Sequence, residues 1–131
     1  MITGSPGPAP PLVLIVDDND KNRKLARDVL GAAGLRTLEA ASGSAAIALA
    51  AEQLPDVILL DLRLPDMDGT DVAIALKRDA RTAPIPLVAL TAVRTGDDSW
   101  LDPAGFAGYL EKPIRVDEFP AQVKRYARTG V

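Results

Sequence analysis

Short apolar runs alternate with amphipathic stretches along this chain, which predicts strands and helices in turn. The apolar runs predict strands at residues 12–16, 57–60 and 86–90, a brief one at residues 108–111, and a second, weaker strand over residues 35–40. Helical spacing of apolar residues predicts helices over Asp20 to Ala33 and Asp117 to Arg128, and a short one over Thr95 to Asp102. It also predicts one helix that follows Ser42 and reaches Leu54, and one that carries Val72, Ala73 and Leu76. Such alternation favours a parallel sheet with helices on both faces, and right-handed crossovers make it an open, doubly wound α/β fold.

Several of the predicted helix ends carry local signals. Ser42 can cap the second helix, because a serine hydroxyl accepts a hydrogen bond from a free backbone amide. Gly34 suits the turn that ends the first helix. Asp68 and Gly69 fit the turn that starts the third helix. Pro120 falls in the first turn of the last helix, where a missing amide hydrogen costs little.

The polar residues that follow the strong strands have side chains suited to one site. They are Asp17, Asp18, Asp61, Thr91 and Lys112. The carboxyl ends of parallel strands meet at one edge of an open sheet, where such folds place their functional sites. A single aspartate at a strand end is commonly a turn or cap residue. The convergence of all these residues on one edge instead favours a functional site.

The residue types at this edge indicate a particular chemistry. Neighbouring carboxylates repel one another, and a divalent cation relieves that repulsion. Oxygen ligands without histidine or cysteine favour Mg²⁺, Mn²⁺ or Ca²⁺ over zinc, and few protein ligands with several waters suit Mg²⁺ best. A metal beside a carboxylate, a hydroxyl and an ammonium group indicates phosphoryl transfer, in which the carboxylate attacks and cations disperse the charge.

Composition narrows the possible functions. The chain has 131 residues, of which 47% are hydrophobic and 25% charged, as expected of one globular domain. Its 15 basic and 18 acidic residues give a net charge of −3, which argues against a partner held by its phosphate backbone. The absence of cysteine and histidine excludes disulfides, thiolate or imidazole metal sites, cysteine nucleophiles, histidine triads and a phosphohistidine carrier role.

The two ends of the chain differ from its middle. Residues 1–11 are rich in proline and glycine, so we expect a flexible N-terminal tail, a folded domain over residues 12–128 and a short tail over residues 129–131. The first residues show no secretory signal pattern, and no apolar run is long enough to cross a bilayer. We therefore expect a cytoplasmic protein without membrane insertion.

Four segments together resemble a known family. They are LIVDDND at the first strand, DVILLDLRLPDMDG around Asp61, PLVALTA around Thr91 and GYLEKPI around Lys112. In these segments, and over about residues 11–128, the sequence closely resembles the receiver domain of bacterial response regulators, the CheY-like family. The resemblance implies a flavodoxin-like sheet of five parallel strands in the order 2-1-3-4-5. The run NDKNR with LPDMDG is most similar to small stand-alone regulators of the chemotaxis and cell-cycle kind.

The resemblance implies a role for each acidic residue. Asp61 is expected to be the phosphoacceptor. Asp18 and Asp61 are expected to bind Mg²⁺, or Mn²⁺ in its place, directly. Asp17 is expected to hold the ion through water, and the backbone carbonyl of Arg63 to supply a further ligand.

The remaining residues are expected to respond to the phosphoryl group. Thr91 would hydrogen-bond a phosphoryl oxygen, and Lys112 would pair with Asp61 and then with the phosphate. The bond between Lys112 and Pro113 is expected to be cis. Tyr109 occupies the aromatic switch position. Its inward rotation with movement of Thr91 would remodel the face made by the fourth helix, fifth strand and fifth helix.

The implied function is that of a response regulator in two-component signal transduction. A sensor histidine kinase or a histidine phosphotransfer protein would donate the phosphoryl group. The protein would be no enzyme with a separate substrate, because its only reactions are its own phosphorylation and dephosphorylation. Little chain follows Lys112, so we expect it to act by binding an unidentified downstream protein or by passing its phosphoryl group onward. The acidic balance of the chain argues against direct nucleic acid binding. Pro103 and a short segment before Lys112 predict a short fourth helix.

Two other functions fit parts of the sequence. Residues 66–70 spell DxDGT, the nucleophile motif of haloacid-dehalogenase-like phosphatases, with Asp66 and Asp68 as its carboxylates. In that family the first aspartate follows a strand directly, whereas here the strand has already ended at Asp61, and there is no room for a cap domain. A pseudo-receiver that binds partners without phosphorylation would normally lack an acidic residue, the threonine or the lysine, and all are present.

Overall fold

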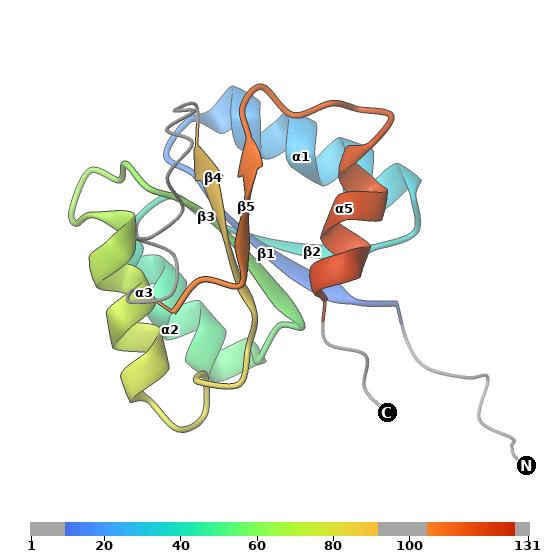
Figure 1. Ribbon diagram of the computed structural model, residues 1–131. Helices are drawn as coiled ribbons and strands as arrows, with labels where there is room; N and C mark the ends of the chain where they lie inside the picture. The colour runs from blue at the N-terminus through green and yellow to red at the C-terminus, as the bar shows by residue number, and fades with distance from the viewer. Residues whose placement is uncertain (1–9, 92–104, 128–131) are drawn as a thin grey trace, which may run out of the picture.

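The computed structural model describes residues 10–91 and 105–127 and shows a sheet between two layers of helices (Figure 1). The strands are β1 Leu12–Val16, β2 Arg36–Ala40, β3 Val57–Asp61, β4 Leu87–Thr91 and β5 Gly108–Glu111. The helices in the described ranges are α1 Asp20–Ala32, α2 Gly43–Gln53, α3 Gly69–Arg78 and α5 Phe119–Tyr126. The expected helix over residues 95–102 and the greater part of both expected tails lie outside these ranges.

All strand pairs in the sheet are parallel, and their order is β2-β1-β3-β4-β5. Helices α1 and α5 cover one face and α2 and α3 the other (Figure 1). This arrangement confirms the doubly wound α/β fold and the expected strand order. Because every strand runs in the same direction, all their carboxyl ends meet at one edge.

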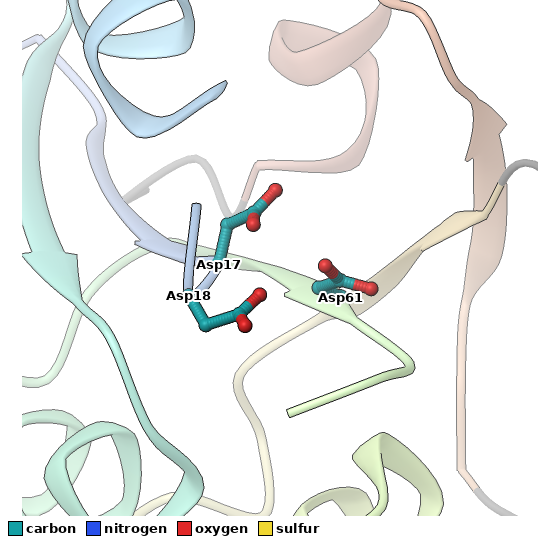
Figure 2. A group of neighbouring side chains, drawn as sticks. All are labelled: Asp17, Asp18 and Asp61. Carbon is teal, nitrogen blue, oxygen red and sulfur yellow. The ribbon is translucent and has the colours of Figure 1, made fainter. Parts of the chain in front are cut away.

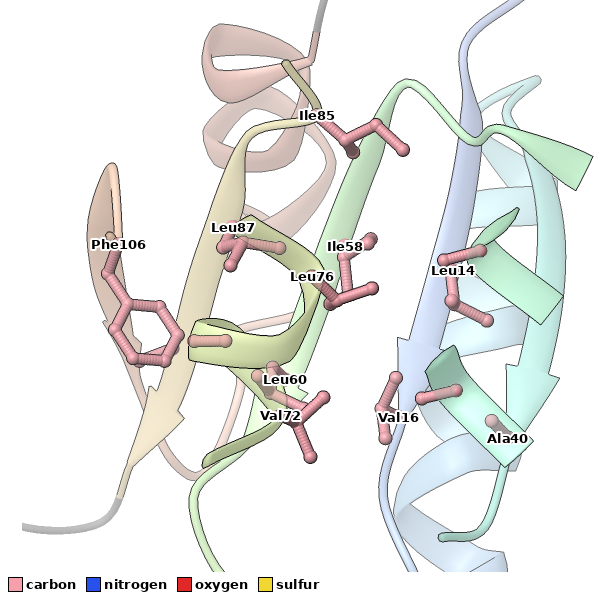
Figure 3. Packing of buried hydrophobic residues seen from close by; sticks show 14 residues of the cluster. Leu14, Val16, Ala40, Ile58, Leu60, Val72, Leu76, Ile85, Leu87 and Phe106 are labelled. Carbon is pink, nitrogen blue, oxygen red and sulfur yellow. The ribbon is translucent and has the colours of Figure 1, made fainter. Parts of the chain in front are cut away.

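The core is divided by the sheet into two clusters, since alternate side chains of a strand point to opposite faces. The cluster beneath α2 and α3 is shown in Figure 3, and its strand residues include Leu14, Val16, Ile58, Leu60 and Leu87. The cluster beneath α1 and α5 includes Val13, Ile15, Leu59, Leu90 and Phe119. Strands β1, β3 and β4 are therefore buried on both faces, which explains why they read as continuous apolar runs.

The helix ends follow most of the expected signals. The hydroxyl of Ser42 accepts from the amide of Ala45 at 3.2 Å and caps α2. Gly34 follows α1 with a φ of 88°, a conformation that favours glycine. Helix α5 begins at Phe119, two residues after the expected start, and keeps Pro120 in its first turn. None of the helices that the structure describes is long and apolar enough to span a bilayer.

The burial of apolar side chains of β3 in this core should contribute strongly to the stability of the fold. Ile58 is fully buried, whereas Ile74 on α3 is 37% exposed. We expect Ile58→Ala to lower the free energy of unfolding by about 2–5 kcal/mol, since it loses apolar burial and leaves a cavity. Urea unfolding followed by circular dichroism measures this change. Ile74→Ala is the matched control and should change stability by less than about 1 kcal/mol; equal effects of the two substitutions would contradict the described packing.

Candidate functional site

Three aspartates meet at the carboxyl edge of the sheet. Val16 of β1 pairs with Leu60 of β3, so Asp17 and Asp61 follow at neighbouring positions on adjacent strands. Asp17, Asp18 and Asp61 each contribute one carboxylate oxygen, and these three oxygens lie within 4.8 Å of one another. Figure 2 shows the Asp18 carboxylate turned toward Asp61. The expected acidic cluster therefore forms, with Asp17 2% and Asp61 8% exposed and Asp18 open to solvent.

Lys112 brings a positive charge into this cluster from the end of β5. Its amide donates to the carbonyl of Thr91 at 2.8 Å, which continues the ladder between β4 and β5. Its Nζ donates to Asp61 Oδ2 at 2.8 Å and to Asp17 Oδ2 at 3.1 Å. The sequence predicted the contact with Asp61 but not the one with Asp17. The peptide bond between Lys112 and Pro113 is cis.

The surroundings of Lys112 keep it protonated. Burial by itself lowers the pKa of the ammonium group, but the hydrogen bonds and negative charges of Asp61 and Asp17 outweigh burial. The pKa of Lys112 therefore lies above its ordinary value. The site accordingly holds a fixed cation among its carboxylates at neutral pH.

The other carboxylate oxygens are held by their own loops, with one exception. Asp17 Oδ1 accepts from the amide of Asn19 at 2.9 Å, and Asp61 Oδ1 accepts from the amide of Arg63 at 3.0 Å. Among the residues that the structure describes, none donates a hydrogen bond to the Asp18 carboxylate. Asp18 thus presents the most accessible oxygens of the cluster.

The remaining predicted residues lie close by, at different depths along the strands. Thr91 ends β4 and is 8% exposed, one strand away from Asp61, which pairs with Leu90. Tyr109 lies further back on β5, opposite Ala89 in the register. Its half-buried ring packs against the core cluster beneath α2 and α3. The carboxyl edge of the sheet therefore carries Thr91, Lys112 and the three aspartates. Tyr109 lies two residues before the end of β5 and packs against the core cluster.

The donor set fits a hard divalent cation. Its ligand atoms are carboxylate oxygens, and neither histidine nor cysteine occurs anywhere in the chain. Such a set, with room for water on the solvent side of Asp18, suits Mg²⁺ or Mn²⁺. The backbone carbonyl of Arg63 follows Asp61 closely enough in the chain to add a ligand from the same loop.

Asp66 lies outside this cluster and caps the N-terminus of α2. Its Oδ1 accepts from the amide of Gly43 at 2.7 Å and its Oδ2 from that of Ser44 at 2.9 Å. Together with Ser42, it satisfies the first free amides of α2. Asp68 is the N-cap residue of α3, but its side chain accepts no capping hydrogen bond. The DxDGT segment is thus a loop that caps α2 and starts α3, which disfavours its use as a phosphatase nucleophile.

Comparison with known proteins agrees with this geometry. The profile of the response regulator receiver domain family matches residues 13–124. This chain belongs to that family. Receiver domains act in two-component signalling, and neither a haloacid-dehalogenase-like phosphatase nor a pseudo-receiver is favoured.

Individual relatives of this receiver domain support the same assignment. The polar-differentiation response regulator DivK of Brucella ovis is 41% identical over 115 residues, covering 87% of this chain and 94% of the relative. The chemotaxis response regulator CheY4 of Vibrio cholerae superposes with a TM-score of 0.84 at 28% identity, covering 90% of this chain and 99% of that one.

A third relative bears on the metal. The receiver domain of the sensor histidine kinase PA1611 from Pseudomonas aeruginosa has a TM-score of 0.81 and 32% identity, and covers 90% of this chain and 98% of that one. Its structure has a magnesium ion coordinated in the active site cleft. The acidic cluster of this receiver domain fits phosphorylation and Mg²⁺ binding.

The cap formed by Asp66 predicts a pH-dependent contribution to stability. The backbone hydrogen bonds from Gly43 and Ser44 hold the pKa of Asp66 below its ordinary value of 3.8. A carboxyl whose pKa is lowered by folding stabilises the fold above its unfolded pKa, and this contribution disappears as the pH falls through the folded pKa. We expect Asp66→Asn to lower the urea midpoint at pH 7, and the difference from wild type to shrink below pH 3.8.

Asp68→Asn serves as the matched control, because the side chain of Asp68 makes no cap hydrogen bond. Its urea midpoint should stay close to that of the wild type across the same pH range. A larger loss for Asp68→Asn than for Asp66→Asn would overturn the assignment of the cap.

Proposed function

We propose that this receiver domain accepts a phosphoryl group on Asp61 from a phosphohistidine of a sensor histidine kinase or a histidine phosphotransfer protein. The observation that supports this most is the environment of Asp61. Its carboxylate lies at the end of β3, beside Asp17 and Asp18 and against the ammonium group of Lys112. A carboxylate held in place at an open edge, next to a fixed cation, is well prepared to attack phosphorus.

In the proposed reaction, a carboxylate oxygen of Asp61 attacks the phosphorus atom and forms the P–O bond of an acyl phosphate. The P–N bond of the phosphohistidine breaks, and its electron pair returns to the imidazole nitrogen. Lys112 then pairs with a phosphoryl oxygen, and the hydroxyl of Thr91 hydrogen-bonds another. The protein therefore acts as the acceptor of the group and has no separate substrate.

The acidic cluster fits the metal ligands that the family resemblance implies. Asp18 and Asp61 would hold Mg²⁺ directly, Asp17 would hold it through water, and the carbonyl of Arg63 would supply a further ligand; Mn²⁺ could take the same place. When bound, the cation disperses negative charge on the transferring group. Its charge also counters the mutual repulsion of the three carboxylates.

The proposed output involves Tyr109 and the face around β5 and α5. Phosphorylation shifts a two-state equilibrium only through interactions that differ between the states. Thr91 and Tyr109 supply these, since Thr91 lies at the site and Tyr109 packs into the core behind it. The remodelled face, to which the fourth helix also belongs, would bind an unidentified downstream protein. We place the receiver domain at residues 12–128, in the cytoplasm, without membrane insertion or direct nucleic acid binding.

The first test of this proposal is direct. Incubation with Mg²⁺ and acetyl phosphate should add one phosphoryl group that is stable in acid and labile in base, detected by intact mass. Asp61→Asn should abolish the addition because it removes the nucleophile. Asp66→Asn should retain it, because Asp66 caps α2 and lies outside the cluster.

The opposite pattern, with addition lost in Asp66→Asn and kept in Asp61→Asn, would favour a phosphatase-type nucleophile. A wild-type protein that binds Mg²⁺ but takes no phosphoryl group from any donor would support the pseudo-receiver instead.

The metal proposal predicts a specific loss of Mg²⁺ affinity. Asp18→Asn should raise the Kd for Mg²⁺, measured by calorimetry, by at least about tenfold, since removing even an indirect partner of a metal site commonly costs that much. Asp28→Asn removes the same charge from the exposed side of α1, where Asp28 pairs with Lys24, and should leave the Kd nearly unchanged. Equal effects of the two substitutions on the Kd would show that Mg²⁺ affinity depends only on the net charge of the protein, which would contradict the proposed ligand role of Asp18.

A further inference from the structure

The loop between β1 and α1, which carries two of the three aspartates, is held by an arginine on α1. Arg23 Nη1 donates to the backbone carbonyl of Asp17 at 2.8 Å. Its Nη2 forms an ion pair with Asp20, and its Nε donates to Glu39 Oε1 at 3.3 Å. The side chain of Arg23 is 15% exposed, so it lies mostly within the structure.

The position of this hydrogen bond is what matters for the site. The carbonyl of Asp17 belongs to the peptide unit that links Asp17 to Asp18. The hydrogen bond to this oxygen therefore fixes the orientation of that peptide plane, and with it the direction in which the Asp18 side chain leaves the backbone. On its other side, the amide of Asp17 donates to the carbonyl of Ala40 at 3.1 Å. The Asp18 side chain has no donor among the described residues. Its placement therefore depends on the backbone, which Arg23 holds.

Glu39 of β2 orients Arg23 in turn. Its Oε1 accepts from Arg23, while its Oε2 accepts from Nη1 of Arg27 at 3.1 Å. The planar guanidinium group of Arg23 meets Glu39 with one edge and the Asp17 carbonyl with another. A lysine has no such fork and cannot make both contacts in the same geometry.

From this geometry we infer that Arg23 is a positioning residue for the cation site. It sets the peptide between Asp17 and Asp18 so that the Asp18 carboxylate faces Asp61, and it would not itself be a ligand of the ion. The inference rests on the proposed function, since it assumes that these carboxylates hold Mg²⁺. Arg23 thus links the cation site to β2, which contributes no ligand of its own.

A simple charge effect predicts the opposite result, which makes the inference testable. Arg23 is a cation close to three carboxylates, so its charge alone opposes the binding of another cation. If charge were its only influence, Arg23→Met would bind Mg²⁺ more tightly than the wild type, and Arg23→Lys would bind equally well. If Arg23 positions the loop, both substitutions weaken binding.

The experiment measures the Kd for Mg²⁺ by calorimetry at fixed ionic strength in the wild type, Arg23→Met, Arg23→Lys and Arg27→Met. Arg27 is the matched control, because it pairs with the same Glu39 from the same helix and does not contact Asp17. We expect both Arg23 variants to raise the Kd about tenfold, the size typical of lost outer contacts to a metal site. Arg27→Met should change it less than about twofold.

Phosphorylation by acetyl phosphate gives a second readout. The Arg23 variants should require more Mg²⁺ for half-maximal phosphorylation but approach the wild-type rate when Mg²⁺ is saturating. Urea unfolding without Mg²⁺ identifies any variant that has lost its fold; Arg23→Lys, the milder change, then carries the test alone.

Tighter or unchanged Mg²⁺ binding in a folded Arg23 variant overturns the inference, as does an equal loss in Arg27→Met. The proposed function fails in a different way. In that case the wild type itself binds no Mg²⁺, or takes no phosphoryl group on Asp61.

Discussion

The ion pair between Lys112 and two buried aspartates is the interaction on which the site depends. Asp17 and Asp61 are almost completely removed from water, and each carries a negative charge at the end of its own strand. Buried charges of the same sign destabilise a fold unless an opposite charge meets them. Lys112 supplies that charge from the end of the edge strand β5, and its ammonium group lies 2.8 Å from Asp61 Oδ2 and 3.1 Å from Asp17 Oδ2. The edge strand β5 is therefore tied electrostatically to β1 and β3, with which it shares no backbone pairing.

The two buried aspartates are also held by their own loops. Asp17 and Asp61 each accept a hydrogen bond from the amide two residues further along the chain. Such turns hold a carboxylate against its own backbone and leave its second oxygen for another partner. Lys112 takes the second oxygen of both residues. Asp18, which is exposed, is then the acidic side chain that can meet an incoming cation without first giving up a contact.

Much of this could be predicted from the sequence, because it depends on local patterns. The predicted strands lie within about one residue of those observed, most of them marked by apolar runs, and Ser42 and Gly34 act at helix ends as their residue types predict. The contacts that were not predicted join residues that are distant in sequence. Asp66 reaches the start of α2 from another loop, and Lys112 reaches Asp17 across the sheet. Neither contact leaves a signal in the sequence, because each depends on the path that a loop takes through space.

The cap made by Asp66 has a mechanical consequence for the site. The loop that follows Asp61 is fastened to α2 by two hydrogen bonds to a charged carboxylate, and such bonds are roughly twice as strong as neutral ones. Gly69 also packs closely against the backbone of Asp61, because a Cβ atom at this position would lie only 2.7 Å from the carbonyl oxygen of Asp61. The wall of the site that this loop forms is consequently held in place. A movement of Asp61 toward α2 would therefore have to break the hydrogen bonds of Asp66 or press the backbone of Asp61 against Gly69.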